Sequence, residues 1–118
     1  HIDDALATLA AQGIDAGRAT TAERVSPAGL LRWRIAGRSD GQLLYGGALP
    51  TLIEWGDQHP SDSLPASALQ LTALSLGGLP AAVAAALGLR AVPQRSEGPA
   101  LSACLSTPRG EVWLHSEV

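Results

Sequence analysis

The sequence contains no lysine, no methionine and no phenylalanine, and it has only one cysteine, three tryptophans and one tyrosine. Because a single cysteine cannot form an internal disulfide, Cys104 suits a reducing compartment, and we expect a cytoplasmic protein. No apolar run is long enough to span a bilayer and no signal peptide is recognisable, which argues against a membrane protein. The net charge is only −3 and the arginines form no basic stripe, so nucleic acid is not an expected partner.

Two segments of similar pattern are predicted to be helices, in a chain of 118 residues that suffices for one domain with a modest core. The predicted helices span residues 3–14 and 79–89. In the first, Asp3 or Asp4 can cap the N-terminus, because a short carboxylate accepts hydrogen bonds from the free N–H groups of the first turn. Gly13 then ends this helix, while Pro80 suits the first position of the second helix and Gly88 its end.

The remaining apolar segments predict strands. Weak strands are expected at residues 14–16 and 91–94, and stronger ones at residues 30–36, 49–55, 69–76, 100–106 and 111–118. The second half therefore has the order strand, helix and three strands, and the first half repeats it without the first strand. We expect an α+β fold of two βαβββ-type units that together form one domain. The units cover residues 1–57 and 68–118, with a linker at residues 58–67.

Alternation along the strands assigns the side chains to two faces of the predicted sheet. The face expected to pack against the helices carries Leu31, Trp33, Ile35, Val112 and Leu114. The other face carries Arg32, Arg34, Glu54, Ser102, Cys104, Trp113 and His115. Aligning the last strands of the two units pairs Glu54 with His115 and Leu52 with Trp113. A sheet face with charges, an aromatic ring and a histidine is either solvated or lines a cleft.

Several roles are open to the side chains of this polar face. Glu54 can form an ion pair with Arg32 or Arg34, contact a ligand in a cleft, or bind a metal ion. We expect the ion pair, because these residues share a face on strands predicted to be neighbours. His115 is either an exposed strand histidine or part of the cleft, and Trp113 suits the wall of a ligand site.

A family resemblance rests on five segments of the chain. They are LRWRIAG, LPTLIEWGDQHPSDSLP, LQLTALSL, AAVAAALGL and LSTPRGEVWL. With its repeated unit and a Glu in the last strand, the chain resembles the vicinal oxygen chelate superfamily, and more closely its glyoxalase-like domain family. The resemblance implies a curved mixed sheet that lines a cleft, with helices packed on the outer face. Because such proteins usually begin further upstream, the chain, which starts at His1, is expected to be a C-terminal portion.

The resemblance also implies a divalent metal site, to which each unit offers a His from its first strand and a Glu from its last. Glu54 matches the last-strand Glu of the first unit. In the second unit His115 stands where Glu is usual, and Leu71 or Ala73 stands where a His is needed. Since at most two of the usual ligands can be mapped, we expect neither a metal ion nor another cofactor.

Three functions are compatible with these observations. The favoured one is a small-molecule-binding domain without a metal, in which Arg32 and Arg34 hold an anionic or carbonyl group. The alternatives are a metal-dependent lyase or dioxygenase whose other ligands lie upstream, and a structural fragment that associates with other chains. The predicted ligand-binding residues are Arg32, Arg34, Leu52, Glu54, Trp113 and His115. Because the first unit lacks a strand, its open sheet edge predicts a homo-oligomer, such as a homodimer, or pairing with the missing upstream segment.

Overall fold

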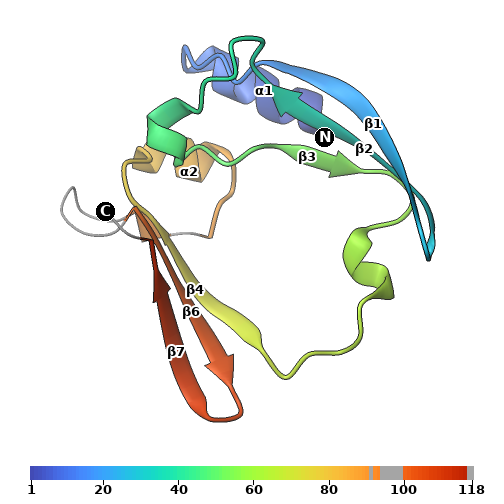
Figure 1. Cartoon of the computed structure of the whole chain (residues 1–118). Coiled ribbons are helices and arrows are strands. Elements are labelled where there is room, and N and C mark those ends of the chain that lie inside the picture. Colours follow the sequence, from blue (N-terminus) through green and yellow to red (C-terminus); the bar gives the residue numbers. More distant parts are fainter. Residues whose placement is uncertain (91, 94–99, 117–118) are drawn as a thin grey trace. The chain divides into compact units, whose positions relative to one another are not determined.

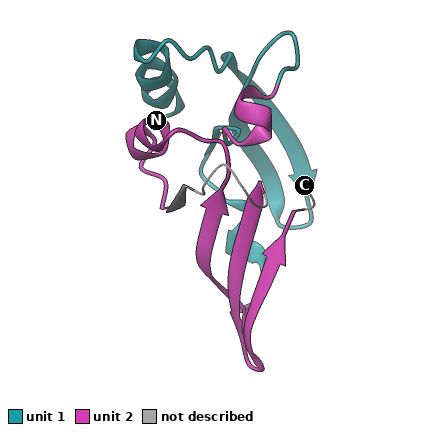
Figure 2. Cartoon of the chain, turned by 90° about the vertical axis from the view of Figure 1, so that its left-hand side faces the viewer, with its two compact units in different colours: residues 1–42, 50–65 teal, residues 43–49, 66–118 magenta. Residues whose placement is uncertain are grey.

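The computed structural model describes residues 1–90, 92–93 and 100–116 (Figure 1). The chain divides into two compact units, of which the first comprises residues 1–42 and 50–65 and the second residues 43–49 and 66–118 (Figure 2). Each unit contains an α-helix and a β-sheet, which confirms the predicted α+β class. In the described part of the chain, no helix is long and apolar enough to cross a membrane.

The first unit combines one α-helix with a three-stranded antiparallel sheet. Its elements are α1 (Ile2–Ala11), β1 (Arg18–Ser26), β2 (Gly29–Gly37), β3 (Ile53–Trp55) and the 3-10 helix η2 (Pro60–Ser63). The sheet order is β1-β2-β3, and a two-residue turn joins β1 to β2. The unit therefore has the predicted order of one helix followed by three strands.

Helix α1 begins at Ile2 and lacks the predicted side-chain cap. His1 occupies the N-cap position without a side-chain hydrogen bond, so the prediction that Asp3 or Asp4 caps the helix is wrong. Both acids instead lie in the first turn, where their negative charges still interact favourably with the partial positive charge of the free N–H groups. Gly13 adopts a φ of +76° and its N–H bonds back to the last turn, which confirms the glycine stop.

Two strands of the first unit differ from the prediction. Residues 14–16 form a loop instead of a weak strand, and β1 follows at residues 18–26. The Asp15 carboxylate accepts the N–H of Gly17 at 2.9 Å, which turns the chain just before β1. β3 is shorter than the strand predicted at residues 49–55, where Pro50 has no N–H group to donate to a ladder.

Helix α1 contacts the sheet face that the sequence pattern assigned to solvent or a cleft. The side chains of Arg34 and Glu54 reach the first turn of α1, and Ala36 on the same face is buried. Because successive residues of a strand point to opposite faces, Trp33 and Ile35 lie on the face away from the helix. Leu31 has the same parity as these two residues, so the prediction that the helix-facing side carries Leu31, Trp33 and Ile35 is wrong in this unit.

The second unit combines one α-helix with a four-stranded sheet. Its elements are the 3-10 helix η1 (Leu44–Gly47), β4 (Gln70–Leu76), α2 (Ala81–Ala86), β5 (Val92–Pro93), β6 (Leu101–Thr107) and β7 (Gly110–His115). The sheet order is β5-β4-β6-β7, with β5 parallel to β4 and the other pairs antiparallel. Pro80 is the N-cap of α2 and not its first helical residue. Of the strands predicted at residues 91–94 and 111–118, residues 91, 94 and 117–118 lie outside the described residues.

The faces of β6 and β7 follow the predicted parity, but their burial does not. The register places Ser102 opposite His115 and Cys104 opposite Trp113, so these four residues share a face. Ser102 and Cys104 are 1% and 2% exposed, so this face is covered at β6. The opposite face of β7 carries Val112 and Leu114, which are 43% and 55% exposed. The prediction that these two residues pack against the helices is wrong.

Candidate functional site

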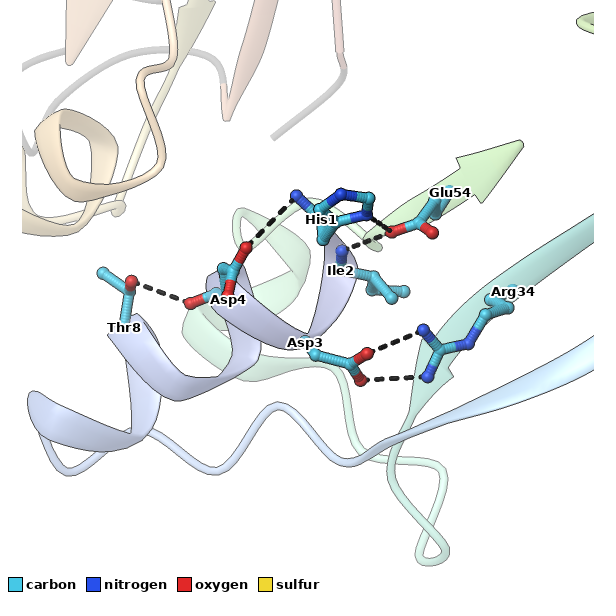
Figure 3. Close-up of polar contacts among 7 residues, drawn as sticks. All are labelled: His1, Ile2, Asp3, Asp4, Thr8, Arg34 and Glu54. Carbon is cyan, nitrogen blue, oxygen red and sulfur yellow. Dashed lines mark hydrogen bonds and ion pairs between the residues drawn. The ribbon is translucent and has the colours of Figure 1, made fainter. Parts of the chain in front are cut away.

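A polar cluster joins the first turn of α1 to β2 and β3 (Figure 3). The Asp3 carboxylate accepts two hydrogen bonds from the Arg34 guanidinium, at 2.8 and 2.9 Å. Beside this pair, Glu54 Oε2 accepts the backbone N–H of Ile2 at 2.6 Å and lies 3.5 Å from Nδ1 of His1. A carboxylate at a helix N-terminus is favourable because the first N–H groups have no partner within the helix. Glu54 therefore caps α1 from a neighbouring strand.

Both arginines of the predicted site are already paired with carboxylates. The hydrogen bond from Arg34 lowers the pKa of Asp3 below its usual 3.8, and the same hydrogen bond raises the pKa of Arg34. Arg32 makes a longer contact, in which its Nε lies 3.3 Å from Glu23 on β1. A ligand at either guanidinium would compete with these carboxylates.

Glu54 is a neighbour of Arg34 but not its ion-pair partner. The two residues lie opposite each other in the ladder between β2 and β3, as their shared parity predicts. The predicted ion pair of Glu54 with Arg32 or Arg34 is nevertheless wrong, because Arg34 binds Asp3 and Arg32 binds Glu23. The physical reason is that α1 offers closer partners to both Arg34 and Glu54.

The remaining predicted site residues lie in two places. Trp113 and His115 are on β7 in the second unit, where their rings stack with centroids 6.1 Å apart. Nδ1 of His115 lies 2.8 Å from the hydroxyl of Ser102 on β6. Leu52 immediately precedes β3 in the first unit, and its carbonyl oxygen bonds to β2. The predicted residues thus form one group in each unit, around Glu54 and around His115.

The described residues do not fit the divalent metal site that the resemblance implies. Among them, no three His, Cys, Asp or Glu side chains gather closely enough to hold an ion. Glu54 is engaged with the N–H of Ile2, and His115 with Ser102, so neither belongs to a set of three ligands. No catalytic step through a metal follows from these residues.

A different feature of the first unit offers room for a ligand. A pocket of about 830 Å³ lies at the end of the ladder between β1 and β2, and we call it the β1–β2 pocket. It is lined by Asp15, Gly17, Arg18, Thr20 and residues 35–39. In the ladder Arg18 is opposite Gly37 and Thr20 is opposite Ile35, so these residues share a face. The Arg34 side chain points to α1, and its neighbour Ile35 points to the opposite face of β2. The other three residues of these two ladder pairs share a face with Ile35, so all four lie on the face away from the helix.

Two glycines shape the floor of the β1–β2 pocket. Gly17 has a φ of +91°, and a Cβ on it would run into the backbone of Gly37 and Arg38. The loop before β1 can approach β2 this closely only because Gly17 has no side chain. Gly37, which lies opposite Arg18 in the ladder, likewise has no side chain that would fill the pocket.

The two arginines that line this pocket differ in how they are engaged. Arg38 donates to Asp40 through Nε and a terminal nitrogen, at 3.0 and 2.6 Å, and to the carbonyl oxygen of Asp15 at 2.9 Å. The hydrogen bonds from Arg38, and then that from the Gln42 N–H, lower the pKa of Asp40 to about 2. Arg18, by contrast, forms no ion pair with any residue that the structure describes. Its charge remains available to a ligand.

An apolar strip continues from the pocket along the same face. Ile35 is opposite Ile53, and Trp33 is opposite Trp55 with the ring centroids 5.2 Å apart. The His59 ring packs edge-on against Trp55, with centroids 5.4 Å apart. A cationic end beside an apolar, aromatic strip is typical of sites that bind small molecules.

The prediction of a strand at residues 14–16 overlooked β1 and, with it, Arg18. A usable signal is present in the sequence. The segment RATTAERVS contains threonines and a valine, which favour strands, and it is followed by a short turn that contains Pro27. A hairpin closed by that turn would have placed Arg18 opposite Gly37.

Comparisons with known proteins identify the family. The family profile described as "Glyoxalase-like domain" matches residues 1–92. Neither a search of curated proteins nor a search of solved structures found a match. The matched segment covers more than half of the chain and includes the whole first unit. The chain therefore belongs to the glyoxalase-like domain family, which confirms the resemblance to the vicinal oxygen chelate superfamily.

Proposed function

We propose that this glyoxalase-like domain binds a small molecule with an anionic group and an apolar body, and that it does so without a metal ion. The observation that carries the proposal is the uncommitted guanidinium of Arg18 at the rim of a pocket of about 830 Å³. Sites for small molecules in proteins have volumes of about 300–1,000 Å³ and combine apolar walls with a few polar groups. The β1–β2 pocket lies within that range.

The contacts of the pocket support a different role for each of its ends. Arg18 would bind the anionic group through charge-assisted hydrogen bonds, which are the stronger class. Arg38 is held by Asp15 and Asp40, so it would shape the rim more than contact the ligand. The apolar body would lie along Ile35 and the neighbouring strip toward Trp33.

This placement differs from the predicted ligand-binding residues Arg32, Arg34, Leu52, Glu54, Trp113 and His115, which stay a prediction. Arg32 and Arg34 would first have to give up Glu23 and Asp3, whereas Arg18 would not. The favoured site is therefore the one whose cation loses no existing partner. A cytoplasmic location is part of the proposal and is supported by the single buried cysteine.

An NMR titration of the full chain tests the proposal, with benzoate as an anion that has an apolar body and benzyl alcohol as its neutral analogue. Benzoate should shift the amide signals of Gly17, Thr20 and Gly37 and bind more tightly than benzyl alcohol. Arg18→Gln should weaken benzoate binding by about tenfold or more, since a hydrogen bond to a charged group contributes about 1.5–3 kcal/mol. Arg24→Gln is the matched control, because Arg24 lies on the same strand outside the pocket.

Several results would count against the proposal. The first is a titration in which benzoate shifts no signal near Gly17, and the second is an equal effect of Arg18→Gln and Arg24→Gln. Shifts confined to Arg32, Arg34 and Glu54 would instead favour the originally predicted site. Binding that occurs only after a divalent metal ion is added, and that does not depend on Arg18, would favour the alternative of a metal-dependent lyase or dioxygenase.

A further inference from the structure

Strand β7 presents an exposed edge with large apolar side chains. Among the strands that the structure describes, β7 pairs only with β6, so one side of its backbone faces outward (Figure 1). Val112, Trp113 and Leu114 are 43%, 51% and 55% exposed. An apolar edge strand of this kind is a template for pairing with another chain.

Bonded and non-bonded residue pairs alternate along the β6–β7 hairpin, and this alternation determines which residues of β7 have free backbone groups on the side away from β6. The N–H of Ser116 donates to the carbonyl of Leu101 at 2.8 Å, so these residues form a bonded pair with β6. In an antiparallel ladder, bonded and non-bonded pairs alternate. Leu114 and Val112 therefore point their N–H and C=O groups toward β6, whereas His115, Trp113 and Glu111 point theirs outward.

We propose that a second copy of this chain pairs with β7 through its own β7, antiparallel and around a two-fold axis at Trp113. In this register Trp113 lies opposite the second copy's Trp113, and Glu111 opposite the second copy's His115. All three residues with outward-facing backbone groups then pair with one another, as an antiparallel ladder requires. A shift by one residue would oppose outward-facing groups to inward-facing ones and cannot form the ladder.

The side chains of β7 are self-complementary in the same register. Glu111 meets His115, an acidic group opposite a basic one, and this contact occurs twice because of the symmetry. Nδ1 of His115 is already 2.8 Å from the Ser102 hydroxyl, which orients Nε2 as the nitrogen for the carboxylate. On the other face Val112 meets Leu114, so exposed apolar side chains cover each other. This self-complementarity, a carboxylate opposite an imidazole on one face and apolar side chains opposite each other on the other, favours a second copy over an unrelated partner.

A mixing experiment tests the charge pairing directly. Glu111→Lys places a lysine opposite His115, and His115→Glu places a glutamate opposite Glu111, so each variant alone should dimerise more weakly than the wild type. In an equimolar mixture the introduced lysine of one copy meets the introduced glutamate of the other, while the unchanged Glu111 and His115 meet as in the wild type. Sedimentation velocity should show weaker self-association of each variant, by about tenfold, and recovery in the mixture. Asp57→Lys, which makes the same charge change as Glu111→Lys but on an exposed loop of the first unit, should leave association unchanged.

A backbone variant separates pairing from folding. Trp113→Pro removes an outward-facing N–H, which the pairing with β6 does not use, and proline is tolerated at such edge positions. The fold should persist by circular dichroism while association weakens by at least about tenfold. A wild-type chain that is monomeric throughout the micromolar range would overturn the proposal. So would a mixture of the two charge variants that stays as weak as either variant alone, or a Trp113→Pro variant that folds and associates normally.

Discussion

Replacing Gly17 by alanine should destabilise the protein far more than the same change at Gly13. Both glycines have a positive φ, +91° at Gly17 and +76° at Gly13, and a residue with a Cβ pays about 1–2 kcal/mol in such a conformation. A Cβ at Gly13 would meet nothing within 4 Å, whereas at Gly17 it would overlap the backbone of Gly37 and Arg38. Forcing atoms into a packed site costs about 1–3 kcal/mol more.

The expected loss of unfolding free energy is therefore about 2–5 kcal/mol for Gly17→Ala and about 1–2 kcal/mol for Gly13→Ala. The effect of alanine on the unfolded chain is the same at both positions and cancels in the comparison. Urea unfolding followed by circular dichroism measures both values, provided that the transitions have the same slope. Equal destabilisation by the two substitutions would refute the close approach of Gly17 to β2, and with it the shape of the β1–β2 pocket.

Three further predictions concern single side chains. Glu54→Gln should lower the unfolding free energy by about 0.3–1 kcal/mol, because the amide keeps the contact to the Ile2 N–H but loses the charge at the N-terminus of α1. Urea unfolding measures this loss, and an unchanged midpoint would contradict the capping role. The pKa of Asp40 is lower in the folded chain, about 2 against 3.8, so its contribution to stability is present above about pH 4 and is lost as the pH falls toward 2. Arg38→Gln should return that pKa toward 3.8 in an NMR titration of the side-chain carboxyl, and a pKa that stays near 2 would be inconsistent with the Arg38 hydrogen bonds as the main cause. Cys104 is buried and should react with a thiol reagent such as DTNB only after unfolding in urea, so rapid reaction of the native chain would show that β6 is not covered.

Much of the fold could be predicted because its signals are local. The α+β class, the order of helices and strands in each unit and the glycine stops at Gly13 and Gly88 follow from periodicity and backbone preference, and the structure confirms them. Parity likewise predicted that Arg34 shares a face with Glu54 and that Cys104 shares a face with Trp113, and the ladder registers confirm both. β1 was missed because a weak strand was placed too early, although RATTAERVS and its turn carry a strand signal.

The sequence by itself determined which residues share a face of each strand, because side chains alternate along any extended backbone. It did not determine which face α1 covers, since Trp33 and Ile35 are as suitable for packing against a helix as for lining an open apolar strip. Only the tertiary structure decided that Arg34 and Glu54 meet the first turn of α1. There Asp3 lies closer to Arg34 than Glu54 does, and the Ile2 N–H lies closer to Glu54 than Arg34 does. The choice among competing charged partners depends on distances of a few ångströms between elements far apart in the chain, and no local pattern of residues encodes those distances.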